Sequence, residues 1–326
     1  MNNIETAVEP RQRKPPIARV WKIAQPLLLI GTLVFVTYAL YSRWSDVETA
    51  ARRTTFHWGW IFAASGIVLA TYAMLVESWR LLIRASGASL NYGPAVMIWT
   101  SANLGRYLPG KVWSVGALGV LAQRFGVPGF VAAGAAIIGT LLNLGAGFGI
   151  TALTAWGSLD AFPRPVRYTA IFGGIAYVGG LALLPWILPP LVTRIARWRR
   201  STVPADVPPV STLWLAALLN SLSWIGYGIA FACFTRGAVP SVTGSPLLFI
   251  AVYAASYLAG YLALFAPGGI GWREAALATA ISALGMATSP DAIVLGLLSR
   301  VWLTVLEIVP GLIGLGAMTL RKTKPA

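Results

Sequence analysis

Long apolar segments, each close to the length that crosses a lipid bilayer, recur along almost the whole sequence. A helix needs about 20 mainly apolar residues to span the hydrocarbon core of a membrane, and on this criterion the sequence predicts about eight transmembrane helices. The chain is therefore expected to be an all-α polytopic membrane protein, since helices satisfy their own backbone groups in lipid. The predicted spans are Pro26–Tyr41, Trp58–Ile83, Gly129–Trp156, Val166–Pro190, Ser211–Thr235, Pro246–Ala266, Gly269–Thr288 and Asp291–Leu320.

The scarcity of charged residues excludes soluble and disordered classes of protein. Only 11% of the 326 residues are charged and 57% are hydrophobic, whereas an average soluble domain has about 25% charged residues. The single histidine, His57, and the single cysteine, Cys233, are too few for a His/Cys metal centre or an internal disulfide. Neither a P-loop nor a Gly-x-Ser-x-Gly motif occurs. The sequence thus predicts no catalytic residue, no cofactor and no metal.

The basic residues predict an orientation in the membrane. The net charge is +15, and most lysines and arginines between the spans fall on the cytoplasmic side if the N-terminus is placed there. The positive-inside rule then predicts an inner-membrane protein with both termini in the cytoplasm. A long basic stretch precedes the first span without an A-x-A site, which favours an uncleaved helix over a signal peptide. The expected regions are a basic tail over 1–25, a first membrane half over 26–192, a basic, proline-rich cytoplasmic loop over 193–210, a second half over 211–320 and a basic tail over 321–326.

One apolar segment, residues 93–121, is interrupted in its middle by Arg106, Pro109, Gly110 and Lys111. Proline removes a backbone donor and disfavours helix at the preceding residue, and glycine adopts turn conformations easily. Irregular backbone at membrane depth is tolerated only where protein or a water-filled cavity covers it. The segment is therefore predicted to be a re-entrant hairpin or a broken helix.

The second half contains a similar break. The stretches 103–111 and 261–269 both lead into Pro-Gly, and a tryptophan and a basic residue follow in each. Paired breaks of this kind indicate a binding site formed by a two-half repeat, although a Pro-Gly pair can also simply end a helix at the membrane surface. The predicted hinge residues are Pro109, Gly110, Pro267, Gly268, Gly269 and Gly271.

These two motifs carry a resemblance to a known family. Pro267-Gly-Gly-Ile-Gly-Trp-Arg-Glu-Ala-Ala-Leu277 resembles the P-x-x-G-G-x-G-x-R-E-A signature of the lysylphosphatidylglycerol synthase transmembrane (flippase-like) family, with a shorter interval after the proline. Arg106-Tyr-Leu-Pro-Gly-Lys-Val-Trp113 resembles its first-half motif, where many members have P-x-R-x-G-E. Members fused to a soluble aminoacyl-transfer domain make and flip aminoacylated phosphatidylglycerol. The resemblance implies a stand-alone, lipid-translocating form without that synthase domain.

Ionisable side chains inside apolar spans are energetically costly and therefore mark candidate functional positions. Glu77 and Arg80 share one helix face, Arg300 and Glu307 share another, and Glu274 is favoured by the dipole of the helix that it begins. Purely structural roles remain open: Glu77–Arg80 as a snorkelling surface pair, Arg273 as a cytoplasmic anchor, and Glu307 as an internal partner of Arg300, Arg273 or Arg106. The candidate lipid-headgroup residues are Arg106, Lys111, Arg273, Glu274, Glu77, Arg80, Arg300 and Glu307.

The chemistry of these residues favours an anionic lipid as ligand, because arginine binds phosphate through two parallel hydrogen bonds and lysine binds it as a point charge. We expect a protein that binds or translocates an anionic phospholipid or a lipid-linked precursor, with membrane lipids and no nucleic acid as partners. The alternatives are an accessory subunit of a separate cytoplasmic synthase or glycosyltransferase, or a polyprenyl-phosphate-dependent transferase with Glu77 or Glu307 as its acid or base. Asn103, Asn143 and Asn220 are expected to join helices.

Overall fold

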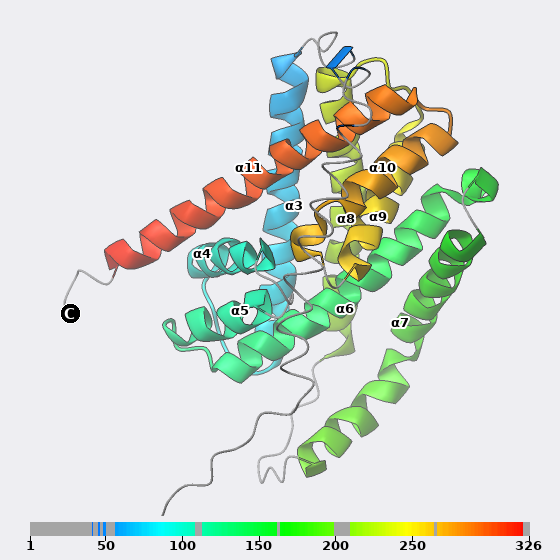
Figure 1. Cartoon of the computed structure of the whole chain (residues 1–326). Helices are drawn as coiled ribbons and strands as arrows, with labels where there is room; N and C mark the ends of the chain where they lie inside the picture. The colour runs from blue at the N-terminus through cyan, green and yellow to red at the C-terminus, as the bar shows by residue number, and fades with distance from the viewer. Residues whose placement is uncertain are drawn as a thin grey trace, which may run out of the picture.

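The computed structural model describes residues 56–107, 113–161, 164–198, 209–263 and 266–321, with a few single positions between 41 and 49 (Figure 1). Several predicted features lie outside the described residues. They are the first span, most of the loop over 193–210, the C-terminal tail beyond Arg321, and the three break residues Pro109, Gly110 and Lys111.

The described residues form helices and no strand, as predicted. The elements are α3 (Trp58–Ala85), α4 (Tyr92–Asn103), η1 (Leu104–Tyr107), α5 (Trp113–Gln123), α6 (Gly129–Thr154), η2 (Trp156–Ala161), α7 (Arg164–Trp198), α8 (Val210–Ala238), α9 (Pro246–Leu262), η3 (Pro267–Gly269), α10 (Trp272–Ala283) and α11 (Ser289–Arg321).

Five of these helices, α3, α6, α7, α8 and α11, are long and apolar enough to cross a membrane. Their outer faces are covered with exposed hydrophobic side chains. Phe62 on α3, Phe172 on α7 and Ile313 on α11 are 70%, 65% and 66% exposed. Apolar surface of this extent requires a nonaqueous surrounding. The chain is therefore a multi-pass membrane protein.

The predicted span at 269–288 is wrong. It contains α10, a helix of only 12 residues, which rises about 18 Å and cannot cross a hydrocarbon core of about 30 Å. Glycines with positive φ lie on both sides of it: Gly271 (φ 83°) precedes the helix and Gly285 (φ 64°) follows it. The preceding helix, α9, has 17 residues and is also shorter than a typical span.

The helix α7 extends beyond its predicted end. The sequence places the end of this span at Pro190, but the helix continues to Trp198, into the predicted loop, with Pro185, Pro189 and Pro190 inside it. Prolines are tolerated in membrane helices because neighbouring groups and local adjustments satisfy the freed carbonyls.

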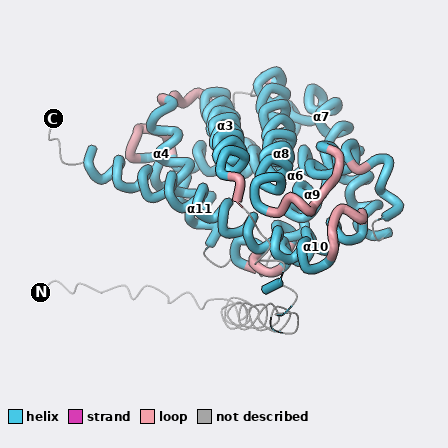
Figure 2. The backbone as a smooth tube through the Cα atoms, turned by 90° about the horizontal axis from the view of Figure 1, so that it is seen from above, coloured by secondary structure: helices cyan, strands magenta, loops and turns pink. Residues whose placement is uncertain are grey.

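The two halves of the chain have corresponding elements and make reciprocal contacts. In each half a long helix is followed by a short helical hairpin and another long helix: α3, α4–α5, α6 in the first, and α8, α9–α10, α11 in the second. The helices α3 and α8 pack along each other, α4 packs on α11, and α9 packs on α6 (Figures 1 and 2). This exchange of equivalent partners agrees with the predicted two-half repeat.

The two hairpins meet at their breaks, where η1 contacts η3. The second break is tight because its glycines adopt left-handed conformations, with φ 59° at Gly268 and 71° at Gly269. A Cβ on Gly269 would lie 3.0 Å from the Cα of Gly260. Glycine is therefore required here, both for the turn and for the close approach of the backbone to α9.

Candidate functional site

A cavity of about 610 Å³ lies where the two hairpins meet the long helices. Its wall includes residues of both breaks and of α3, α6, α8 and α11. Ligand sites in proteins have volumes of about 300–1,000 Å³ and combine apolar walls with a few polar groups. Four ionisable residues singled out from the sequence line this cavity: Arg106, Arg273, Arg300 and Glu307.

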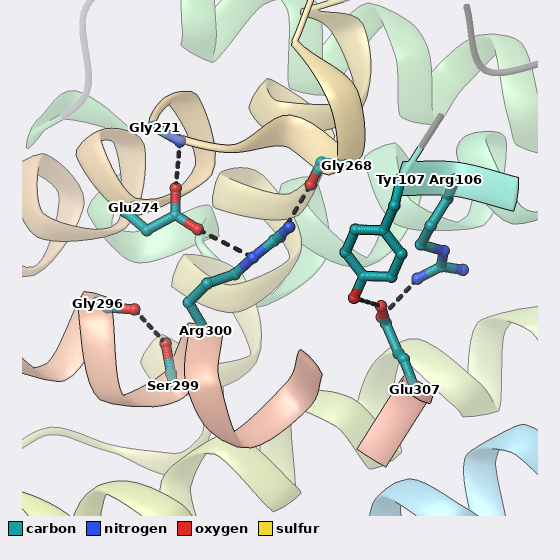
Figure 3. A network of polar contacts seen from close by, with 9 residues as sticks. All are labelled: Arg106, Tyr107, Gly268, Gly271, Glu274, Gly296, Ser299, Arg300 and Glu307. Atoms are coloured by element: carbon teal, nitrogen blue, oxygen red, sulfur yellow. Dashed lines mark hydrogen bonds and ion pairs between the residues drawn. The ribbon is translucent and has the colours of Figure 1, made fainter. Parts of the chain in front are cut away.

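The first break is attached to α11 through Glu307. Arg106 donates to one carboxylate oxygen of Glu307 through Nη1 at 2.5 Å, and the Tyr107 hydroxyl donates to the other at 2.5 Å (Figure 3). Arg106 also donates to Oδ1 of Asn103 at 2.6 Å. The side chains of Arg106 and Glu307 are only 26% and 10% exposed. The sequence leaves three possible partners for Glu307, and in the structure Glu307 forms its ion pair with Arg106.

The second break is attached to α11 through Arg300. Its Nη1 donates to the carbonyl oxygen of Gly268 at 2.8 Å, and its Nε lies 3.6 Å from Oε1 of Glu274 (Figure 3). The other carboxylate oxygen of Glu274 accepts a hydrogen bond of 2.6 Å from the backbone N–H of Gly271. Glu274 therefore caps the N-terminus of α10, as its position in the sequence suggests.

These two attachments form one continuous group. Arg300 and Glu307 lie about two turns apart on α11, and both point toward the hairpin breaks (Figure 3). The guanidinium carbon of Arg300 lies 5.9 Å from the centre of the Tyr107 ring. The helix α11 thus contacts the tips of both hairpins through two partly buried, charged side chains.

Arg273 differs from the other two cavity arginines. It is 7% exposed, and its guanidinium carbon lies 5.0 Å from the ring centres of both Tyr253 and Tyr257. Among the described residues, no carboxylate lies within 4 Å of its guanidinium nitrogens. Arg273 is therefore buried and held by aromatic faces, with its charge not neutralised by a direct ion pair within the described part of the chain.

Glu77 and Arg80 lie apart from this group and do not line the cavity. They form an ion pair with each other on α3, with hydrogen bonds of 2.7 and 2.8 Å, and Arg80 also lies over the ring of Tyr92. The ion pair is thus confined to one helix, with the side chains of Arg80 and Glu77 14% and 28% exposed.

An aromatic wall of the cavity was not predicted from the sequence. It consists of Trp224, Tyr227 and Tyr257, which all line the cavity. Trp224 and Tyr257 meet edge to face at 5.2 Å, and Tyr227 stacks on Tyr253 at 5.5 Å. The spacing of Tyr253, Tyr257 and Tyr261 is the one available signal, because residues four apart share a helix face.

Two of the asparagines join helices, as expected. Asn143 on α6 donates to Oδ1 of Asn220 on α8 at 3.0 Å, and Asn220 donates to Oγ of Ser78 on α3 at 2.8 Å. These side chains also line the cavity, so they form its neutral polar surface as well as an interhelical contact.

Comparison with known proteins identifies the family. Among curated proteins no relative matches the chain. The family model described as the lysylphosphatidylglycerol synthase TM region matches residues 26–311, which include both Pro-Gly breaks and all four ionisable residues of the cavity. The chain belongs to the family of the lysylphosphatidylglycerol synthase TM region.

Proposed function

We propose that this protein binds the headgroup of an anionic lipid in the cavity between its hairpins and moves it across the membrane. The observation that carries the proposal is Arg273, a buried cation on the cavity wall with no carboxylate within ion-pair distance among the described residues. A lipid phosphate would supply the missing negative charge.

The energetics of burial support this reading. An arginine inside a membrane bundle is costly unless a partner or water compensates its charge. The two tyrosine rings at 5.0 Å compensate part of this cost through cation–π interactions of about 0.5–2 kcal/mol each. A phosphate oxygen offers a stronger, charge-assisted hydrogen bond. The site is therefore suited to an anionic group.

The proposal is tested with the purified full chain in proteoliposomes that contain fluorescent phosphatidylglycerol. Translocation is followed by the accessibility of the fluorophore to a membrane-impermeant quencher. Replacing Arg273 by glutamine is expected to slow translocation at least about tenfold, because one charge-assisted hydrogen bond is worth about 1.5–3 kcal/mol. Arg236→Gln is the matched control, since Arg236 also lies over an aromatic ring, that of Trp60, and does not line the cavity; it should retain the rate.

Equal rates for the Arg273→Gln protein and the control would contradict this role. Absence of translocation of any anionic lipid by the folded native protein would instead favour the accessory-subunit or transferase alternatives, and copurification of a cytoplasmic synthase or glycosyltransferase would then be sought.

The proposal includes an inner-membrane orientation with both termini in the cytoplasm, which the distribution of basic residues supports. The single cysteine, Cys233, is buried, so a second cysteine introduced by Ala326→Cys reports the location of the C-terminus. We expect a membrane-impermeant thiol reagent to label this variant in inside-out vesicles and to leave it unlabelled in intact spheroplasts. Labelling in intact spheroplasts but not in inside-out vesicles would show that the introduced cysteine lies on the other side of the membrane and would contradict the proposed orientation.

A further inference from the structure

The described charges in the cavity wall and directly behind it balance except for one. Three arginines and one glutamate of the described residues line the cavity. Arg106 is paired with Glu307, and Arg300 is paired with Glu274 behind the wall. Arg273 is the remaining cation. With Glu274 included, these described side chains have an excess of one positive charge, which a ligand with a single negative charge would neutralise.

The two carboxylates near the cavity are not available to a ligand. Both oxygens of Glu307 already accept hydrogen bonds, from Arg106 and Tyr107. One oxygen of Glu274 accepts from the backbone of Gly271, and the other, Oε1, is buried, accepts no hydrogen bond and lies 3.6 Å from Nε of Arg300. An ammonium group on a ligand would therefore meet three arginines and, among the described residues that line the cavity, one carboxylate whose two oxygens already accept hydrogen bonds. A cationic headgroup would be repelled.

The cavity has a neutral polar end as well as a charged one, and an aromatic wall connects them. Arg273 lies 5.0 Å from the Tyr257 ring, which contacts Trp224. The indole N–H of Trp224 donates to the backbone carbonyl of Asn143 at 2.8 Å. Beside Asn143, the cavity is lined by Thr140, Ser78 and Asn220.

Neutral amides and hydroxyls bind hydroxyl groups well because each can donate or accept a hydrogen bond. Aromatic faces next to them provide an apolar surface for the C–H groups of a polyol. A site that hydrogen-bonds a ligand hydroxyl also rejects an analogue that lacks it, since its own polar groups are left unpaired.

We infer that this cavity selects lipids whose phosphate is a singly charged diester with a neutral, hydroxyl-bearing headgroup: Arg273 binds the phosphate, and Asn143 with Thr140 binds the headgroup hydroxyls. This inference rests on the proposed function and specifies its substrate class. Two lipid sources carry the same chemistry, a glycerol headgroup on a phospholipid and a sugar on a polyprenyl phosphate.

The test measures binding of single lipids to the full-length, detergent-solubilised protein by native mass spectrometry. Phosphatidylglycerol and a polyprenyl-phosphoryl hexose represent the two sources, and the one that binds more tightly identifies the source. Phosphatidic acid lacks the headgroup, and lysyl-phosphatidylglycerol has a cationic one. We expect at least one of the first two lipids to bind about tenfold more tightly than either of the last two, a preference that corresponds to the loss of one hydrogen bond or charge contact.

Two variants separate a headgroup contact from a structural role. Asn143→Ala and Thr140→Val should both weaken binding of the preferred lipid and leave binding of phosphatidic acid unchanged. Thr140→Val is the safer variant, because the Thr140 hydroxyl donates only to the carbonyl of Ala136 in its own helix. Equal weakening of every lipid in both variants would overturn the headgroup role.

The remaining outcomes distinguish the two proposals. If lysyl-phosphatidylglycerol or phosphatidic acid binds as tightly as the preferred lipid, the headgroup inference is overturned while the proposed lipid binding stands. If the folded protein, shown to be monodisperse, binds none of the lipids, the proposed function is overturned together with the inference.

Discussion

The Glu307→Ala protein is expected to lose about 3–5 kcal/mol of its free energy of unfolding, the cost of leaving a buried charge without its partner. Glu307 accepts from both Arg106 and Tyr107, and its side chain is 10% exposed. Its removal leaves the Arg106 guanidinium with the hydrogen bond to Asn103 but without an ion pair, and it removes the contacts of Arg106 and Tyr107 with α11. Equilibrium unfolding in detergent micelles, followed by circular dichroism, measures this change.

A second ion pair of the same chemistry is the control. Glu77→Ala breaks an ion pair between residues three apart on a single helix. Pairs of this kind contribute about 0.2–0.5 kcal/mol, so this change should cost no more than about 1 kcal/mol. The double variant Arg106→Ala/Glu307→Ala should be more stable than the sum of the two single losses predicts, because it removes both charges together. Equal losses for Glu307→Ala and Glu77→Ala would show that the cavity pair is not buried as described.

Replacing Gly228 by leucine is expected to prevent the packing of α8 against α9. A Cβ at this position would lie 2.4 Å from the backbone Cα of Ile250, a contact that only a movement of the helices can relieve. Overpacking of a core costs about 1–3 kcal/mol and sometimes more, and here the obstacle is a backbone atom. We expect a loss of at least about 3 kcal/mol of unfolding free energy, together with loss of lipid binding.

Lipid binding is expected to be lost because the interface between α8 and α9 also positions the aromatic ring that contacts Arg273. Tyr227 on α8 stacks on Tyr253 on α9 at 5.5 Å, and Arg273 lies over Tyr253. Gly66→Leu is the matched control, because a Cβ on Gly66 in α3 would have no atom within 4 Å. The thermal stability of the two variants is compared by heating each protein and measuring the fraction that remains folded by size-exclusion chromatography. A Gly228→Leu protein as stable as the control would disprove the close approach of α8 and α9.

The sequence was sufficient to predict the helical membrane fold and the interruption of one apolar segment in each half. Both predictions depend on local properties, namely hydropathy and the backbone chemistry of proline and glycine. The dependence on local properties also explains why the predicted span at 269–288 is wrong. The stretch is apolar enough for a span, but hydropathy does not report that α10 ends at Ala283.

The site depended on contacts between distant residues, which the sequence alone leaves open. Glu307 had three possible partners, and only the packing of η1 on α11 selects Arg106, 201 residues away. Glu77 was an equally good candidate by composition, yet its partner is three residues away and both lie outside the cavity. The four-residue spacing of Tyr253, Tyr257 and Tyr261 indicates a shared helix face but not its partner, so the contact of Tyr257 with Trp224 is known only from the fold.

The attachment of both hairpin tips to α11 has a consequence for leakage of ions through the protein. Arg300 and Glu307 lie on one helix, and the two prolines of that helix, Pro290 and Pro310, fall outside the stretch between them. A shift of this stretch therefore loosens both tips together, so the two breaks behave as one cooperative unit. States in which one tip is released and the other stays bound are disfavoured. For the lipid transport proposed above, we expect this coupling to change the exposure of the cavity in a single concerted step, which would limit the leakage of ions.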